Sequence, residues 1–237
     1  MLGIQKEVEE IIVNSNHLEC RFDFYDVKQA VSCLKFNKND GGTGLKSDHF
    51  IHASDDCFTH IALLFSSIIV HGAVPDSFIR SSIIPIPKGK HGAASDSTKY
   101  RGVALSSMYG KIFDNLVLSR YGDCLSSSEL QFGFKAKSST NLCSMVLKES
   151  LSYYAHHQSS VFCTFLDASK AFDRVRYCKL FRMLVTRKVP ALIIRVLIYF
   201  YLFNFVRVQW CGIVSDYFLA GNGVKQGIES CSFLSIY

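Results

Sequence analysis

The sequence predicts an α+β fold, on the strength of its composition, its mixed order of elements and a local hairpin near its end. The 237 residues are 49% hydrophobic and 13% aromatic, which is ample for a packed core and far from disordered composition. Helical and strand patterns are mixed along the chain. Phe205–Trp210 alternates like a strand and turns at Gly212 into a partner at Asp216–Leu219. Such a hairpin argues against a doubly wound sheet.

The first elements are helical. Val27–Leu34 and Ser47–Val70 carry apolar residues at helical spacing, and Ser47 is a candidate N-cap for the second helix. Its apolar face comprises Phe50, Cys57, Phe58, Ile61, Leu64, Phe65 and Ile68. Residues 39–44 between the two helices read as a loop.

The opposite face of the second helix carries His49, His52, Asp56 and His60. This spacing is compatible with a metal site, because imidazole and carboxylate groups on one helix face can converge on one ion. A solvated polar stripe is far commoner, and we favour that interpretation.

A strand at Ile79–Ile86 is expected next, ended by Pro85 and Pro87. A basic loop follows it and contains Lys88, Lys90, Lys99 and Arg101. The later elements expected before residue 160 are a strand at Val103–Leu105, a helix at Lys111–Leu118, and a helix capped by Ser139 or Thr140 that runs to about His156.

Val161–Leu166 is an apolar run that reads as a buried strand, and it ends on Asp167. A helical turn from Ser169 and two further helices are expected between this run and the hairpin. Pro190–Val206 is strongly apolar, but it is shorter than a membrane span and contains Arg195. We therefore expect a core helix that runs into a strand.

Charge and cysteine content restrict the class of protein. The net charge is +6, and residues 78–140 hold nine Lys or Arg against four Asp or Glu. A polyanionic partner would therefore meet the middle and end of the chain. Nine cysteines form no C-x-x-C pair, which favours buried reduced thiols over a zinc or disulfide framework. No signal peptide is expected, because charged residues interrupt the first thirteen positions.

Three separated elements share one chemical theme. Lys88 and Arg101 could hold a triphosphate, Asp167 could hold Mg²⁺ on it, and the glycine-flanked Gln226-Gly227 could let backbone and amide approach a nucleotide. Each has an ordinary alternative: surface charges, an N-cap aspartate and turn glycines. Their joint occurrence favours a nucleotide site.

Five motifs give the chain a family resemblance. They are Ser82-Ile-Ile-Pro-Ile-Pro-Lys88, Tyr100-Arg-Gly-Val-Ala-Leu-Ser106 followed by Lys111-Ile-Phe113, Gln131-Phe-Gly-Phe-Lys135 with Ser139-Thr140, Phe165-Leu-Asp-Ala-Ser-Lys-Ala-Phe-Asp-Arg-Val175, and Asn222-Gly-Val-Lys-Gln-Gly227. In this order, from about Val27 to the end, the chain resembles the reverse-transcriptase domain of a non-LTR (LINE-type) retrotransposon.

The resemblance implies a polymerase right-hand fold with fingers and a partial palm, and without a thumb. Residues 1–26 would be an N-terminal extension, residues 27–160 a fingers-like region, and residues 161–237 the partial palm. The implied activity is RNA-directed DNA synthesis by two-metal nucleotidyl transfer. The implied partners are an RNA template, a DNA primer and deoxynucleoside triphosphates, with no membrane and no obligate protein partner. The implied location is intracellular, nuclear or cytoplasmic.

The resemblance also implies a role for individual residues. Asp167 would coordinate both Mg²⁺ ions, or Mn²⁺ in their place, with the backbone carbonyl of Ala168 assisting one of them. Phe172 would be the steric gate that excludes a ribose 2′-hydroxyl. Lys88 and Arg101 would neutralise the incoming triphosphate, and Gln226 and Gly227 would line the nucleotide pocket. Asp173 is expected to be structural, held by Arg174 or Arg176.

Departures from the family pattern bear on activity. Gly42-Thr-Gly44 stands where a Gly-x-Asp-Gly turn is usual, and Tyr237 comes before any Tyr-x-Asp-Asp segment, which would bring the remaining metal-binding carboxylates. We therefore expect the 237-residue chain alone to be inactive. The alternatives are a decayed element copy that retains at most nucleic-acid binding, and an aspartyl-nucleophile phosphatase. The phosphatase is disfavoured because residue 169 is Ser and not a second acid.

Overall fold

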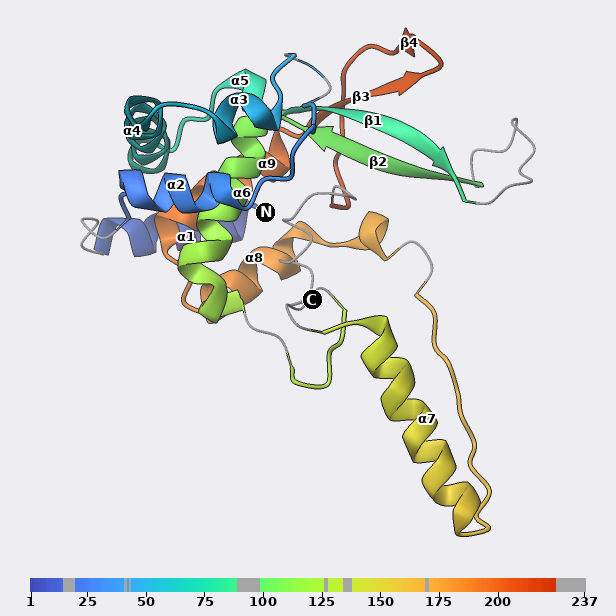
Figure 1. The fold of residues 1–237 in the computed structure, drawn as a ribbon. Helices are drawn as coiled ribbons and strands as arrows, with labels where there is room; N and C mark the ends of the chain where they lie inside the picture. The colour runs from blue at the N-terminus through green and yellow to red at the C-terminus, as the bar shows by residue number, and fades with distance from the viewer. Residues whose placement is uncertain are drawn as a thin grey trace.

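A helical body supports a twisted sheet in the computed structural model, and one further helix projects away from both (Figure 1). The structure describes residues 1–14, 20–40, 42, 44–88, 99–125, 128–133, 138–168 and 171–224. The helices of these ranges are α1 (Leu2–Asn14), α2 (Phe24–Ser32), α3 (Ser47–Ile51), α4 (Asp55–His71), α5 (Asp76–Ile79), α6 (Met108–Tyr121), η3 (Gly122–Leu125), α7 (Thr140–His156), η4 (Phe172–Arg174), α8 (Tyr177–Thr186) and α9 (Ala191–Leu202). The strands are β1 (Arg80–Pro87), β2 (Tyr100–Ser106), β3 (Phe205–Trp210), β4 (Ile213–Val214) and β5 (Phe218–Leu219).

The expectation of one helix over Ser47–Val70 is wrong, because the chain breaks between α3 and α4. Ser54 lies at the break, and its hydroxyl accepts a hydrogen bond from the backbone N–H of Cys57 at 3.4 Å. This side-chain cap starts a second helix where the apolar spacing alone indicated a continuous one. Ser47 is the first residue of α3 and not its cap, and its hydroxyl accepts from the N–H of Lys38 at 3.0 Å.

The hydrophobic core packs α1, at the start of the chain, against α9, near its end. Ile4, Val8 and Ile12 on α1 are buried in the same hydrophobic cluster as the apolar residues of α9. Arg195 of α9 donates from Nη2 to the carbonyl oxygens of Ile69 and Val70, at 3.0 and 2.9 Å. These carbonyls lie in the last turn of α4, where a cation is favourable.

The helix predicted within Pro190–Val206 is confirmed as α9, and it leads into β3. It lies inside the body, with six of its residues buried. Within the described ranges, none of the helices combines the length and the apolarity that crossing a membrane requires.

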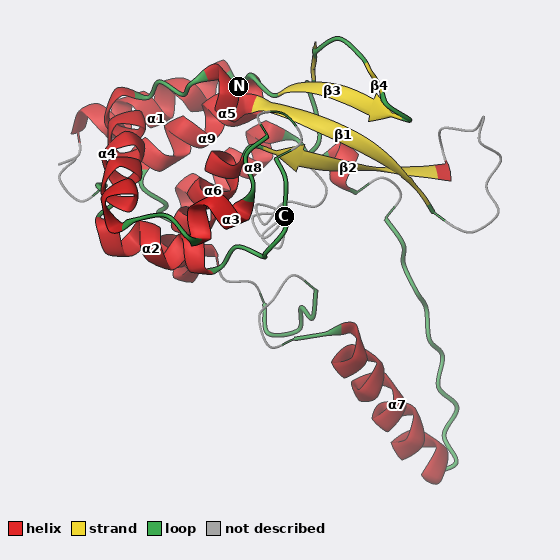
Figure 2. Cartoon of the chain, turned by 45° about the horizontal axis from the view of Figure 1, so that its top comes forward, coloured by secondary structure: helices red, strands yellow, loops and turns green. Residues whose placement is uncertain are grey.

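The sheet lies on one side of the helical body and has the order β2-β1-β3-β4, with β5 also pairing with β3 (Figure 2). β1 pairs antiparallel with β2 and parallel with β3. The predicted turn at Gly212 is confirmed. Cys211 and Gly212 have φ values of 50° and 81°, as in the two-residue turns that match strand twist. The mixture of helices and sheet confirms the α+β class.

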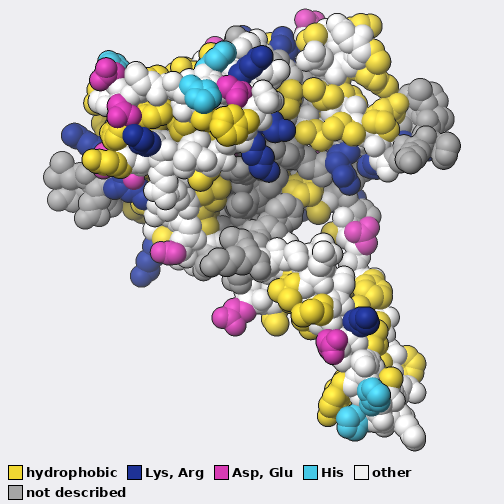
Figure 3. Space-filling view, in the orientation of Figure 1, with side chains coloured by type: hydrophobic (Ala, Val, Ile, Leu, Met, Phe, Trp, Pro, Cys, Tyr) yellow, Lys and Arg dark blue, Asp and Glu magenta, His cyan; other side chains and the backbone are white. Residues whose placement is uncertain are grey.

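The buried strand expected at Val161–Leu166 is wrong. Residues 161–168 are extended, but they pair with no described strand, and Leu166 is 95% exposed. α7 before them has no buried residue, and hydrophobic side chains are spread over its surface (Figure 3). An apolar run becomes a buried strand only if another strand and a packing layer meet it, and the described residues supply neither.

Candidate functional site

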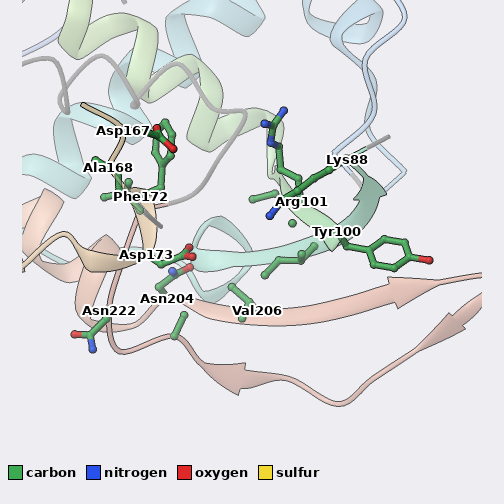
Figure 4. Close-up of a pocket in the computed structure, with 17 residues that line it drawn as sticks. Lys88, Tyr100, Arg101, Asp167, Ala168, Phe172, Asp173, Asn204, Val206 and Asn222 are labelled. Carbon is green, nitrogen blue, oxygen red and sulfur yellow. The ribbon is translucent and has the colours of Figure 1, made fainter. Parts of the chain in front are cut away.

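A cleft of about 820 Å³ lies between the sheet and the two segments around residues 167–174 and 220–224 (Figure 4). β1, β2 and β3 provide one wall, and the two segments provide the other. Its lining comprises Ile83, Lys88, Tyr100, Arg101, Gly102, Ala104, Asp167, Ala168, Ala171, Phe172, Asp173, Asn204, Val206, Ala220, Asn222, Gly223 and Val224.

The cleft brings together five of the seven site residues named from the sequence. Lys88, Arg101, Asp167, Ala168 and Phe172 all line it, although they come from distant parts of the chain. The other two, Gln226 and Gly227, lie outside the described residues. The segment immediately before them, residues 222–224, is part of the wall.

Pairing of β1 with β2 places the two cations. Arg101 is opposite Ile86, and the backbone N–H of Lys88 donates to the carbonyl of Lys99 at 2.9 Å. The antiparallel ladder therefore holds Lys88 and Arg101 at the same end of the hairpin, and both side chains are exposed. A planar guanidinium beside a flexible ammonium suits a phosphate-bearing ligand.

Asp167 and Ala168 lie across the cleft from these cations, at the end of the extended segment (Figure 4). Asp167 is exposed, so its carboxylate is open to solvent and to a ligand in the cleft. Phe172 begins the short helix η4 and is half-buried. The cleft thus has a basic end and an acidic end, with an aromatic ring beside the acid.

Gly223 fixes the second segment against the first. Its φ is +79°, and a Cβ at this position would lie 2.9 Å from both the Cα of Asp173 and the carbonyl oxygen of Phe172. The N–H of Val224 donates to that same carbonyl at 2.9 Å. Only glycine fits this combination of backbone conformation and close approach.

Tyr177 also helps to hold Gly223 in place. Its hydroxyl donates to the carbonyl of Gly223 at 2.8 Å. Burial raises the pKa of Tyr177 to about 12, so the hydroxyl keeps its proton and remains a donor through neutral pH. Sequence reasoning missed Tyr177, because a tyrosine at the start of an amphipathic helix gives no signal beyond core packing.

The expected pairing of Asp173 with Arg174 or Arg176 is wrong for the residues described. Neither arginine forms an ion pair with it, and Asp173 lines the cleft instead. The chain turns in η4, which begins at Phe172. Asp173 therefore faces the cleft, whereas Arg174 and Arg176 do not line it. The acidic end therefore has two carboxylates.

Asn204 lines the cleft and is the second residue that the sequence analysis missed. It is 5% exposed, and its Oδ1 has no hydrogen-bond partner among the described residues. A buried acceptor without a partner costs about 1–3 kcal/mol. A polar residue interrupting the apolar run Leu202-Phe203-Asn204-Phe205 was the signal that could have identified it.

The histidine-bearing stripe of α3 and α4 forms no metal centre in the described part of the chain. No three potential ligands among His, Cys, Asp and Glu come together there. The ring Nδ1 of His60 contacts the carbonyl of Asp56 at 2.7 Å, and Nδ1 of His49 accepts from the N–H of Lys46 at 3.3 Å. Local backbone contacts account for both rings.

Comparison with known proteins agrees with this arrangement. A family model described as reverse transcriptase (RNA-dependent DNA polymerase) matches residues 86–236, which include every cleft residue except Ile83. The chain belongs to the reverse transcriptase family.

Two relatives from Drosophila melanogaster place it more narrowly. The RNA-directed DNA polymerase from mobile element jockey is 30% identical over 156 residues, which is 63% of this chain. The putative 115 kDa protein in type-1 retrotransposable element R1DM is 25% identical over 156 residues, or 65% of this chain. The chain spans only 17% and 15% of the length of these relatives. The predicted resemblance to the reverse-transcriptase domain of a LINE-type retrotransposon is therefore confirmed.

Proposed function

We propose that this chain is part of an RNA-directed DNA polymerase that copies an RNA template onto a DNA primer. The observation that carries the proposal is the convergence of Lys88, Arg101, Asp167 and Phe172 on one cleft. The family match supplies the reaction, and the two retrotransposon relatives favour a polymerase over a decayed relic.

Lys88 and Arg101 would bind the triphosphate of an incoming deoxynucleotide. Both cations lie at the hairpin end of the cleft, opposite the acidic residues. Transfer of a nucleotidyl group spreads negative charge over the phosphate oxygens, and fixed cations at that point stabilise the charge without reorganisation. The cleft of about 820 Å³ that these cations and Asp167 line leaves room for the phosphates.

The acidic end fits a divalent cation bound jointly with substrate. Mg²⁺ is held by one or two carboxylates together with phosphate oxygens. Asp167 would supply such a carboxylate and Ala168 a backbone carbonyl, as both line the cleft. When bound, the metal would polarise the phosphate and lower the pKa of the attacking hydroxyl. Two ions would require further carboxylates, which a Tyr-x-Asp-Asp segment would provide.

The exposed apolar surfaces support a longer working protein. Val161–Leu166 and α7 together present a large apolar area to solvent, of the kind that marks an interface. We propose that 161–166 becomes a palm strand when further chain pairs with it. Residues 27–160 would then act as the fingers-like region and residues 161–237 as part of the palm, with Gln226 and Gly227 beside the nucleotide.

Primer extension tests the proposed function directly. We call the longer protein that would contain this chain together with a Tyr-x-Asp-Asp segment the full-length protein. It is expected to incorporate dTTP on poly(rA) primed with oligo(dT) in the presence of Mg²⁺. The 237 residues alone are expected to give none, because Asp167 and Asp173 are the carboxylates that line the described cleft and two metal ions need more. Absence of template-dependent incorporation by the full-length protein would contradict the proposal, and extension by the short chain would contradict the need for further carboxylates.

Phe172→Val in the full-length protein is expected to raise incorporation of ribonucleotides relative to deoxynucleotides by about tenfold or more. The ring lies half-buried in the cleft, beside Asp167 and Ala168, where a sugar attached to the triphosphate would lie. Removing it would open space for a 2′-hydroxyl. The ratio of kcat/KM for rUTP and dTTP measures this, with the exposed Phe36→Val as the matched control. An unchanged ratio would eliminate the steric-gate role.

A further inference from the structure

Two aromatic rings meet at the end of the sheet, just beyond the cleft. Tyr100 on β2 and Trp210 on β3 have ring centroids 5.1 Å apart at an angle of 60°. Tyr100 also lines the cleft, and its ring points away from the acidic end (Figure 4). Trp210 is 43% exposed. Tyr100 is half-buried and Trp210 is partly exposed, so the pair offers ring surface to a ligand in the cleft.

The strand register puts both rings on the cleft face. Tyr100 is opposite Pro87 on β1, and Ile83, which lines the cleft, is opposite Val208 on β3. Side chains two residues apart on a strand share a face, so Pro87, Tyr100 and Trp210 lie on the same side as Ile83. Because β1 lies between β2 and β3, the two rings meet across it.

The surface between the rings has a simple chemistry. β1 contributes Pro85 and Pro87, which have no N–H to donate. The exposed ring atoms and the prolines therefore offer an apolar surface with two ring faces at 60° to each other, which favours ligands that stack on an aromatic ring. A nucleobase has such a face, whatever its sequence identity.

Charge around the rings specifies the rest of the ligand. The described residues 83–88 and 99–104 contain Lys88, Lys99 and Arg101, and no Asp or Glu. Arg207 of β3 lies on the opposite face, where its Nε donates to the hydroxyl of Ser82 at 3.0 Å. An apolar protein segment would gain little from such an environment. A nucleic-acid strand, with planar bases and regularly spaced phosphates, complements both the rings and the cations.

We propose that Tyr100 and Trp210 form a stacking platform for unpaired bases of a single-stranded nucleic acid that leaves the cleft along β1. The inference rests on the proposed function and deepens it, because it states where the unpaired part of the bound nucleic acid lies. Lys88 and Lys99 follow the phosphates, and the two rings hold the bases. The shared chemistry admits RNA and DNA, and the experiment separates them.

Intrinsic fluorescence reports on the platform, because Trp210 is the only tryptophan in the sequence. The 237-residue chain is titrated with oligo(rU), with oligo(dT) and with an abasic deoxyribose-phosphate oligomer of equal length. Either base-bearing strand is expected to quench the emission, and their relative affinities show which is preferred. The abasic oligomer is expected to bind through its phosphates with little quenching. Equal quenching by the abasic oligomer would overturn base stacking.

Substitutions of the two aromatic residues distinguish the contribution of the rings to binding from that of the cations. Tyr100→Leu is expected to weaken binding of the base-bearing strands by about 5- to 100-fold, while Tyr100→Phe changes it about twofold or less. Trp210→Leu and Trp210→Phe repeat the comparison at an exposed position, with binding followed by anisotropy of a labelled strand. Circular dichroism confirms that each variant is folded.

The outcomes distinguish the platform from the proposed function. Binding with unchanged emission, and with unchanged affinity in both leucine variants, would overturn the platform and leave the proposed function standing. No binding of either strand by the wild-type chain would overturn the platform, whereas the proposed function is contradicted only if the full-length protein fails to extend a primer. Emission that responds to an unrelated protein and to neither strand would identify a protein-binding surface instead.

Discussion

Asp167→Asn in the full-length protein is expected to reduce template-directed dTTP incorporation by roughly a thousandfold. The substitution preserves size and removes one negative charge from the acidic end of the cleft, where Asp167 is exposed to a ligand. The proposed role of Asp167 as a metal ligand implies that its loss removes several kcal/mol of transition-state stabilisation, and about 4 kcal/mol corresponds to a thousandfold in rate. Single-turnover primer extension, which isolates the chemical step, measures the loss.

Asp123→Asn is the matched control, because Asp123 is an exposed carboxylate on η3 that does not line the cleft. It is expected to leave extension unchanged. The loss in Asp167→Asn should appear in the maximal rate more than in the concentration of dTTP at half-maximal rate, since Lys88 and Arg101, the residues proposed to hold the triphosphate, are unchanged. Near-normal extension by Asp167→Asn would show that this residue is not a metal ligand.

Gly223→Val is expected to separate the two segments that form the acidic wall. The positive φ of Gly223 alone makes a β-branched residue unfavourable by about 1–3 kcal/mol. The added Cβ would also lie 2.9 Å from backbone atoms of Phe172 and Asp173, and neither can yield without moving η4. For a domain of this size each kcal/mol lowers Tm by about 2–4 °C. Thermal unfolding followed by circular dichroism measures the change.

Two other glycines in the same part of the chain provide controls. Gly221 has no positive φ, and a Cβ added there would meet no described atom within 4 Å, so Gly221→Val is expected to be neutral. Gly212 has a φ of +81° with open space around it, so Gly212→Val isolates the backbone strain. Gly223→Val should exceed Gly212→Val and should weaken hydrogen-exchange protection of the Val224 N–H. Equal effects at positions 212 and 223 would show that the contact with Phe172 contributes nothing.

Local signals in the sequence predicted the elements that depend on local interactions. Ser139 caps α7 as expected, with its hydroxyl accepting from the N–H of Leu142 at 3.2 Å. The turn at Gly212 is also a local event, because it depends on backbone conformations that glycine adopts readily. The break before α4 was missed because the apolar spacing continues across Ser54 and masks the cap.

Elements that depend on distant partners were predicted less well. Val161–Leu166 has the composition of a buried strand, but strand formation requires a neighbour that composition does not specify. The site shows the same division. Motif order predicted that Lys88, Arg101 and Asp167 belong together, whereas Tyr177 and Asn204 enter it only through the packing of α8 and the start of β3.

The burial of α1 against α9 has a consequence for how such a domain can be inherited. The family match begins at residue 86, yet the core that supports the cleft already includes Ile4, Val8 and Ile12. The unit that folds is therefore larger than the unit that similarity detects. A crossover near residue 86 would replace α1 and leave the buried face of α9 against a helix from another sequence, so the core would not be inherited as one unit.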